Sequence, residues 1–278
     1  MTMTVQQLAV GNFEVRQDLN SPPIVYLDHW AVRMFSEQSA IQQRFIRALH
    51  ASGGTLLLSH MNFAEFAAMT DLGQAEATER FLDDVLPALY VADFTSDPGF
   101  MFPGGSPDGP DNPGKHWLFK EVSKQCVRNG GKLTMNSMVT YVVKHRDELQ
   151  PVFVDMKQSI AQAVVSLRDD PAMSAKVSEF RPHVGMTLHD ALIAELLRSS
   201  HIDHGAQFTA NDAVDLVHAV PTVILCDFVL LDGKWCDRIA RADRRMRAGG
   251  MRHTLARCYS NRGAGVHEFL SALEAYGP

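Results

Sequence analysis

Five short apolar runs, spaced by longer segments of helical periodicity, restrict this 278-residue chain to few architectures. The runs cover residues 24–27, 55–59, 88–92, 228–231 and 254–259. Short, continuously apolar strands are typical of parallel sheets that helices cover on both faces. Strands that alternate with helices predict an α/β fold in which a doubly wound, mostly parallel five-stranded sheet is joined by right-handed crossovers.

The segments between the runs suggest how the chain is organised. Helical spacing of apolar residues is clear over residues 38–50 and 75–86. Residues 95–114 are rich in proline and glycine and predict a long loop, whereas the pattern from residue 115 to residue 200 is helical throughout. We therefore expect a single α/β domain over residues 1–278, with residues 95–207 forming a loop and a helical insertion within it.

The composition excludes some classes of protein. At 46% hydrophobic and 21% charged residues, it suits a globular protein with a sizeable core. No apolar stretch reaches the roughly 18 residues that a membrane span needs, so no membrane partner is expected. The N-terminal residues lack the pattern of a signal peptide, and the four cysteines form no CxxC pair, which predicts a cytoplasmic protein with reduced thiols. A net charge of −6 argues against binding nucleic acid through bulk charge.

Four carboxylates occupy positions that such a sheet would bring to one edge. Asp28 ends the first run and Asp232 ends the fourth, whereas Glu65 follows the second run by about two helical turns. Asp215 opens the helix before the fourth run. Ligands of open α/β sheets bind beyond the carboxyl ends of the strands, and clustered acids repel one another unless a divalent cation neutralises them. The pattern predicts that these four residues hold Mg²⁺ or Mn²⁺.

Each acid also has a structural explanation. Asp28 could simply cap the following helix, and Glu65 could turn to solvent or pair with a basic residue. Asp212 and Asp215 would both stabilise the first turn of their helix, by about 0.3–1 kcal/mol each. Since residues three apart face the same way, Asp212 is included as an additional or alternate metal ligand. Asp227, at the opposite end of the fourth run from Asp232, is predicted to be structural.

Candidate substrate contacts follow Asp232 in a segment crowded with arginine. A phosphate-contacting patch beside the acids is one interpretation of this segment, and a solvated helix face is the other. The patch would comprise Arg241, Arg244, Arg245 and Arg252. Ser59 could orient a water in the site, or cap the next helix. The chain lacks a glycine-rich phosphate loop and a Ser-His-Asp nucleophile elbow, which fits hydrolysis by a metal-bound water.

Four segments together resemble the PIN domain, the nuclease fold of many bacterial toxins and RNA-processing enzymes. They are residues 25–28, 57–65, 211–219 and 226–232, within a likeness that covers roughly residues 24–94 and 209–260. The resemblance implies a Rossmann-like three-layer fold and a metal-dependent endoribonuclease that cuts single-stranded or structured RNA, with the acids as ligands. It also implies a toxin–antitoxin setting, with a protein inhibitor or a homo-oligomer as further partners.

The chain departs from the PIN pattern at two positions. The family usually has Thr or Ser two residues before its last acid, where this chain has Leu230. The last acid also often falls one residue later, at the position of Gly233. Two alternatives therefore stay open, namely a scaffold or interaction protein that has lost catalysis, and another kind of metal-dependent phosphohydrolase.

Overall fold

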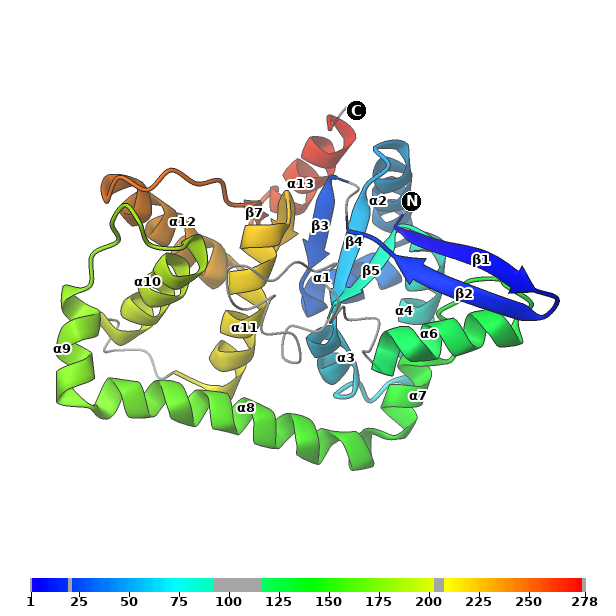
Figure 1. Cartoon of the computed structure of the whole chain (residues 1–278), viewed down its shortest axis with the longest axis horizontal. Coiled ribbons are helices and arrows are strands. Elements are labelled where there is room, and N and C mark those ends of the chain that lie inside the picture. The colour runs from blue at the N-terminus through cyan, green and yellow to red at the C-terminus, as the bar shows by residue number, and fades with distance from the viewer. Residues whose placement is uncertain (1, 20–21, 93–116, 203–207, 277–278) are drawn as a thin grey trace.

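The computed structural model describes residues 2–19, 22–92, 117–202 and 208–276, and the predicted loop at residues 95–114 lies outside them (Figure 1). Its main sheet has five parallel strands in the order β5-β4-β3-β6-β7. The strands are β3 (Ile24–Leu27), β4 (Thr55–Ser59), β5 (Leu89–Ala92), β6 (Phe228–Leu230) and β7 (Arg257–Tyr259). The predicted α/β class with a parallel five-stranded sheet is confirmed, and each strand lies within its predicted run.

The strand order reverses between β3 and β6. From β3 the chain adds β4 and then β5 on one side, and it later returns to place β6 against the other side of β3. The backbone N–H of Asp28 donates to Leu230 O at 3.0 Å, so the carboxyl ends of β3 and β6 lie next to each other. Such a reversal leaves a crevice at the carboxyl edge of a sheet, because the adjoining crossover helices diverge to opposite faces.

Alternation along the strands divides the core into two layers, one on each face of the sheet. In β3, Val25 and Leu27 join one cluster and Tyr26 joins the other, and β4 repeats the pattern with Leu57 in the second cluster. The first layer includes α1 (His29–Glu37), α2 (Ser39–Ala51), α4 (Leu72–Val85) and α13 (Gly265–Glu274). The second includes α10 (Leu188–Ile202), α11 (Ala210–Leu225) and α12 (Gly233–Ala248). The sheet is thus enclosed as a Rossmann-like three-layer α/β arrangement.

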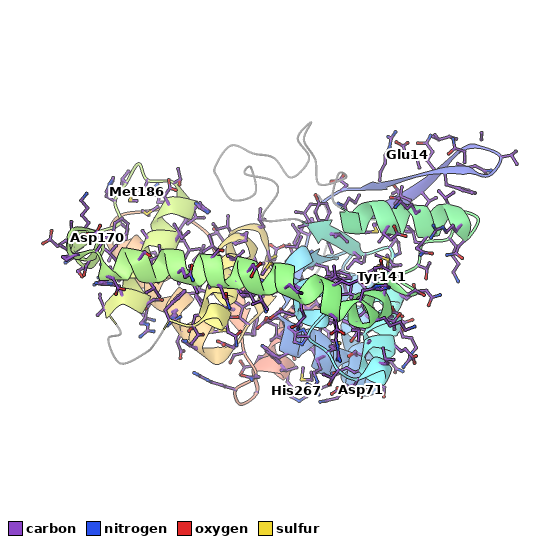
Figure 2. The ribbon with its side chains drawn as sticks, turned by 90° about the horizontal axis from the view of Figure 1, so that it is seen from below. Glu14, Asp71, Tyr141, Asp170, Met186 and His267 are labelled. Carbon is purple, nitrogen blue, oxygen red and sulfur yellow. The ribbon has the colours of Figure 1, made fainter. Side chains whose placement is uncertain are left out.

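A long helix crosses the carboxyl edge of the sheet. The remaining helices are α3 (His60–Phe66), α6 (Trp117–Arg128), α7 (Met138–Lys144), α8 (Arg146–Asp169) and α9 (Pro171–Glu179). Helix α8 contacts both α3 and α11 and lies below them in Figure 1. Figure 2 views the molecule from this side and shows α8 running from near Tyr141 to near Asp170. No helix in the described ranges is both long and apolar enough to cross a membrane.

An N-terminal hairpin was missed by the sequence analysis. Strands β1 (Met3–Ala9) and β2 (Asn12–Gln17) pair antiparallel and project from the body of the fold (Figure 1). The turn uses Gly11 at φ 75°, a conformation that favours glycine. Most side chains of β1 are exposed, and Gln6 and Gln7 stand side by side before Leu8 and Ala9, so the alternation that marks a half-buried strand is weak. The hairpin docks through Met3, whose side chain is buried and whose N–H donates to Pro87 O at 2.8 Å.

The stability of the first core layer is expected to depend on a group of phenylalanines whose rings contact one another. Phe35, Phe45, Phe81 and Phe269 are fully buried, with ring centroids 5.0–6.4 Å apart in the contacting pairs. Phe81→Ala should therefore lower the free energy of unfolding by about 3–5 kcal/mol, through lost burial and the resulting cavity. Urea unfolding monitored by circular dichroism measures the change. The control Leu72→Ala, on the same helix but 44% exposed, should cost less than about 1 kcal/mol, and equal losses would contradict this packing.

Candidate metal centre

Asp28 lies where the strand order reverses, and its position is fixed by the start of a helix. It is the N-cap of α1, and its Oδ1 accepts a hydrogen bond from His29 N at 2.8 Å. The pKa of the Asp28 carboxyl is raised to about 7, first by burial and then by the negative charges of Asp215 and Asp232, which together outweigh the lowering effect of the cap. The capping explanation is correct, but it leaves Asp28 beside two further acids.

Glu65 projects from α3, which follows β4. Its Oε2 atom is buried and has no hydrogen-bond partner among the described residues. Burial, followed by the charges of Asp28 and Asp215, holds the pKa of Glu65 well above its usual range, while Lys157 on α8 acts in the opposite direction. A buried carboxylate without a donor is costly, so this position favours either a proton or a cation.

Trp235 links the two remaining acids. Its indole Nε1 donates to Asp215 Oδ2 at 2.8 Å, and its backbone N–H donates to Asp232 Oδ1 at 2.7 Å, because Asp232 is the N-cap of α12. The pKa of Asp215 is raised to about 6. Burial is the main cause, the charges of Asp232 and Asp212 act in the same direction, and the Trp235 hydrogen bond acts in the opposite direction. The first turn of α12 thus holds Asp215 and Asp232 close enough to repel each other.

The four residues Asp28, Glu65, Asp215 and Asp232, here named the acid group, share one electrostatic neighbourhood. The negative charges of Asp215 and Asp232 raise the pKa of Asp28, and those of Asp28 and Asp215 raise the pKa of Glu65. Within the described ranges, no lysine or arginine forms a salt bridge with any of them. The structure therefore brings the four acids that the sequence singled out within electrostatic reach of one another, with an oxygen each of Asp28 and Glu65 within 4.8 Å of each other, and no ion pair among the described residues compensates their charge.

Asp212, predicted as an additional or alternate metal ligand, lies outside the acid group. Its Oδ2 accepts hydrogen bonds from Thr209 N and Oγ1 at 3.0 and 2.9 Å in a capping box, and its Oδ1 contacts Lys234 Nζ and, at 3.5 Å, Arg238. Although burial raises it, these bonds leave the pKa of Asp212 below its usual value. Because both oxygens are already engaged and the charge is neutralised, Asp212 is a structural residue here and the prediction of a ligand is corrected.

The predicted arginine patch does not border the acid group. Helix α12 begins beside Asp232 and returns the chain to the amino end of β7, so its second half points away from the carboxyl edge. At about 1.5 Å per residue, Arg241 and Arg244 lie roughly 14–18 Å along the axis from Asp232, and Arg252 follows the end of the helix. Arg245 donates to Glu195 Oε2 at 2.7 Å on α10. The basic residues close to the acids are instead Lys157 and Lys234.

Ser59 has the capping role rather than a role in binding substrate. It is fully buried, and it forms a capping box with Asn62 at the start of α3. Its N–H and Oγ both donate to Asn62 Oδ1, at 2.8 and 3.0 Å. Asn62 Nδ2 in turn donates to the Tyr26 hydroxyl at 3.4 Å. Ser59 therefore supports a buried hydrogen-bond network and does not reach a substrate. Asp227, which accepts from Ile24 N at 2.7 Å, is also structural, as the sequence predicted.

Among the residues that the structure describes, His218 joins the site without having been singled out by the sequence analysis. It lies on α11, one turn after Asp215, is 2% exposed, and is hydrogen-bonded through Nδ1 to the hydroxyl of Tyr26. One ring nitrogen of His218 and one carboxylate oxygen each from Asp28 and Glu65 all lie within 4.8 Å of one another. The spacing of Asp215 and His218, three residues apart on a predicted helix, was the available signal. The site therefore offers a nitrogen donor as well as oxygens.

No protein-family model matches the sequence, and no curated protein or solved structure matches it significantly. The fold and the acid group are therefore established from this structure alone. The resemblance to PIN domains rests on the sequence segments given above and stays a prediction.

We expect the acid group to couple metal binding to pH. The folded pKa values of Asp28 and Asp215, about 7 and 6, exceed the ordinary value of 3.8, so their stabilising contribution is complete below about pH 4 and is lost as the pH rises through 6 to 7. Metal-free protein should lose stability across this range, and Mn²⁺ should restore it near pH 8 but not near pH 5, since protons compete with the ion. Thermal unfolding at both pH values, with and without Mn²⁺, tests this. An Mn²⁺ effect independent of pH would contradict it.

The neighbouring acids of α11 should respond oppositely to the same substitution. Asp212→Asn leaves Lys234 and the 3%-exposed Arg238 without their carboxylate and should lower the free energy of unfolding by about 2–3 kcal/mol. Asp215→Asn removes a repelled charge and should leave metal-free stability near pH 8 unchanged or raised. Urea unfolding of both variants without divalent ions provides the comparison, and a larger loss for Asp215→Asn would refute the assignment.

Proposed function

We propose that this chain is a divalent-metal-dependent hydrolase of phosphodiester bonds whose substrate is RNA. The observation that carries the proposal is the acid group, in which four carboxylates converge at the switch point of a parallel sheet without an ion-paired lysine or arginine among the described residues. Hard carboxylate oxygens are the donors that Mg²⁺ and Mn²⁺ take up, and the buried Glu65 Oε2 without a donor fits such an ion. The choice of RNA comes from the resemblance to PIN domains.

The chain's own residues suit this chemistry. A bound divalent ion would lower the pKa of a coordinated water and neutralise charge on the scissile phosphate. Asp28 and Asp232 each use Oδ1 to cap a helix, and the caps fix the orientation of both carboxylates. Trp235 restrains Asp215 in the same way. Lys157 acts electrostatically on Glu65 and His29 from α8, and in our proposal it attracts a phosphate next to the one that is cut.

The two departures from the PIN pattern support an altered form of the site. Leu230 is fully buried in the core layer of α1, α2, α4 and α13, so that position supplies no hydroxyl to the acids. A Cβ at Gly233 would meet the Arg262 side chain at 2.1 Å, so an acid there would first have to displace Arg262. In our proposal, Asp232 takes the position of the last acid, and His218 adds a nitrogen donor next to Asp28 and Glu65.

The proposal predicts cleavage of RNA that depends on both the ion and the acid group. End-labelled single-stranded RNA should be cut in the presence of Mn²⁺, and chelation should stop the reaction. Asp28→Asn or Glu65→Gln should lower the rate by about 100-fold or more, because each removes a ligand of the charge-neutralising ion. The exposed Asp147, 95% accessible, provides a matched control, since Asp147→Asn makes the same charge change away from the site. Gel electrophoresis of the products measures the rates.

Two outcomes would decide against this function. Equal cleavage by wild type and Asp28→Asn would show that a contaminating nuclease or another site acts on the RNA. Turnover of a small phosphodiester such as bis-p-nitrophenyl phosphate, without any cut in RNA or DNA, would favour the alternative of a different metal-dependent phosphohydrolase. Protein that binds Mn²⁺ and turns over neither substrate would favour the non-catalytic scaffold.

A further inference from the structure

We infer that His218 is a nitrogen ligand of the metal centre and that it makes the centre prefer first-row transition ions, such as Mn²⁺ and Zn²⁺, over Mg²⁺. The inference rests on the proposed metal-binding role of the acid group and adds an ion preference to it. The donor atoms of Asp28, Glu65 and His218 lie within 4.8 Å of one another. Neighbouring ligands that bind one ion at about 2.1 Å stand roughly 3.0–3.4 Å apart, so binding would draw the three donor atoms together by up to about 1–2 Å, which side-chain rotation can supply.

A second observation at the same place points to a bound cation. The Oε2 atom of Glu65 is buried and accepts no hydrogen bond from any described residue. Lys157 on the neighbouring helix α8 acts on Glu65 electrostatically, but no salt bridge joins the two side chains in the described ranges. An ion shared with Asp28 and His218 would satisfy this oxygen. The acid group is therefore joined by a nitrogen ligand from His218, and the same place contains a Glu65 oxygen that receives no hydrogen bond from a described residue.

The fold holds the imidazole of His218 in a fixed orientation. The ring is 2% exposed and meets Tyr26 edge-on, with centroids 5.9 Å apart and planes at 80°. Nδ1 is hydrogen-bonded to the Tyr26 hydroxyl, which also accepts from Asn62 Nδ2, and Asn62 is fixed by Ser59. Metal-binding histidines characteristically engage their second nitrogen in such a bond, which sets the tautomer and the ring orientation. We assign Nε2 as the ligand atom and Tyr26 as its positioning residue.

The assignment fixes the protonation of the network. Nε2 can bind an ion only if the ring is neutral and its proton sits on Nδ1, which then donates to the Tyr26 oxygen. The Tyr26 hydroxyl oxygen already accepts from Asn62 Nδ2, and its remaining acceptor capacity can take this bond. The strand that ends in Asp28 thereby also supplies the group that orients His218.

A nitrogen ligand changes which ion the centre prefers. Mg²⁺ requires octahedral oxygen coordination and gives up its waters reluctantly, whereas imidazole binds transition ions more strongly. A site built only from carboxylates would discriminate weakly between Mg²⁺ and Mn²⁺. With His218 as a ligand, Mn²⁺ should bind at least about tenfold more tightly than Mg²⁺, and Zn²⁺ more tightly than Mn²⁺, in the Irving–Williams order.

Electron spin-echo spectroscopy of the wild-type protein loaded with Mn²⁺ tests the ligand directly, without a variant. Coupling of the ion to ¹⁴N from an imidazole is the expected result. Absence of that coupling, or absence of any bound Mn²⁺, overturns the inference. Neither result depends on RNA cleavage. Nitrogen coupling in a protein that cuts no RNA would therefore refute the proposed function but support His218 as a ligand. RNA cleavage without nitrogen coupling would support the proposed function but refute His218 as a ligand.

Calorimetric titration with MnCl₂ and MgCl₂ tests the preference. His218→Ala should weaken Mn²⁺ binding by about 10-fold or more and Mg²⁺ binding much less, and Tyr26→Phe should weaken Mn²⁺ binding by about 10-fold by removing the partner of Nδ1. The exposed His183 supplies the matched control, because His183→Ala should leave both affinities unchanged. Equal losses for the two ions in a folded His218→Ala protein, or a wild type that prefers Mg²⁺, would refute the assignment.

Discussion

Mutual repulsion among buried carboxylates is the constraint that the rest of this structure must accommodate. Asp28, Glu65 and Asp215 each have a raised pKa because burial and neighbouring acids disfavour their charged forms. Backbone geometry holds them together nevertheless. Asp28 and Asp232 cap α1 and α12, so the positive N-terminal ends of two helices offset part of the repulsion. The helix caps and the acid group are therefore one arrangement, in which the caps make the cluster possible.

Two acids on α11 have different roles because their neighbours on α12 differ. Asp212 and Asp215 are three residues apart on α11, and both interact with the start of α12. Asp212 meets Lys234 and Arg238, which neutralise it, whereas Asp215 accepts a hydrogen bond from the neutral indole of Trp235 and forms no ion pair with a described residue. A hydrogen bond from a neutral donor orients a carboxylate without cancelling its charge. Asp215 thus carries no ion pair that would compete with a metal ion, whereas the charge of Asp212 is neutralised by its basic neighbours on α12.

The sequence predicted what local patterns determine and missed what tertiary packing determines. Short apolar runs marked all five strands of the sheet, and acids at strand ends could be placed at one edge because parallel strands share a direction. His218 joins the site because Tyr26, far away in the sequence, faces the core layer that contains α11. The arginines were misplaced because their position depends on the return path of α12, and Arg245 on an ion pair with Glu195, 50 residues away. The β1–β2 hairpin lacks the apolar alternation that would reveal it.

Strand β3 explains why the site and the core cannot vary independently. Val25 and Leu27 face one core layer, Tyr26 faces the other, and the next residue, Asp28, leaves the sheet at its carboxyl edge. The period of two along a strand fixes this order, so a shift of one residue would put Tyr26 in the wrong layer and take its hydroxyl away from His218. Asp28 N–H bonded to Leu230 O sets the same register from the β6 side. The register that packs the core is thus also the one that brings an oxygen and a nitrogen donor together at the edge of the sheet.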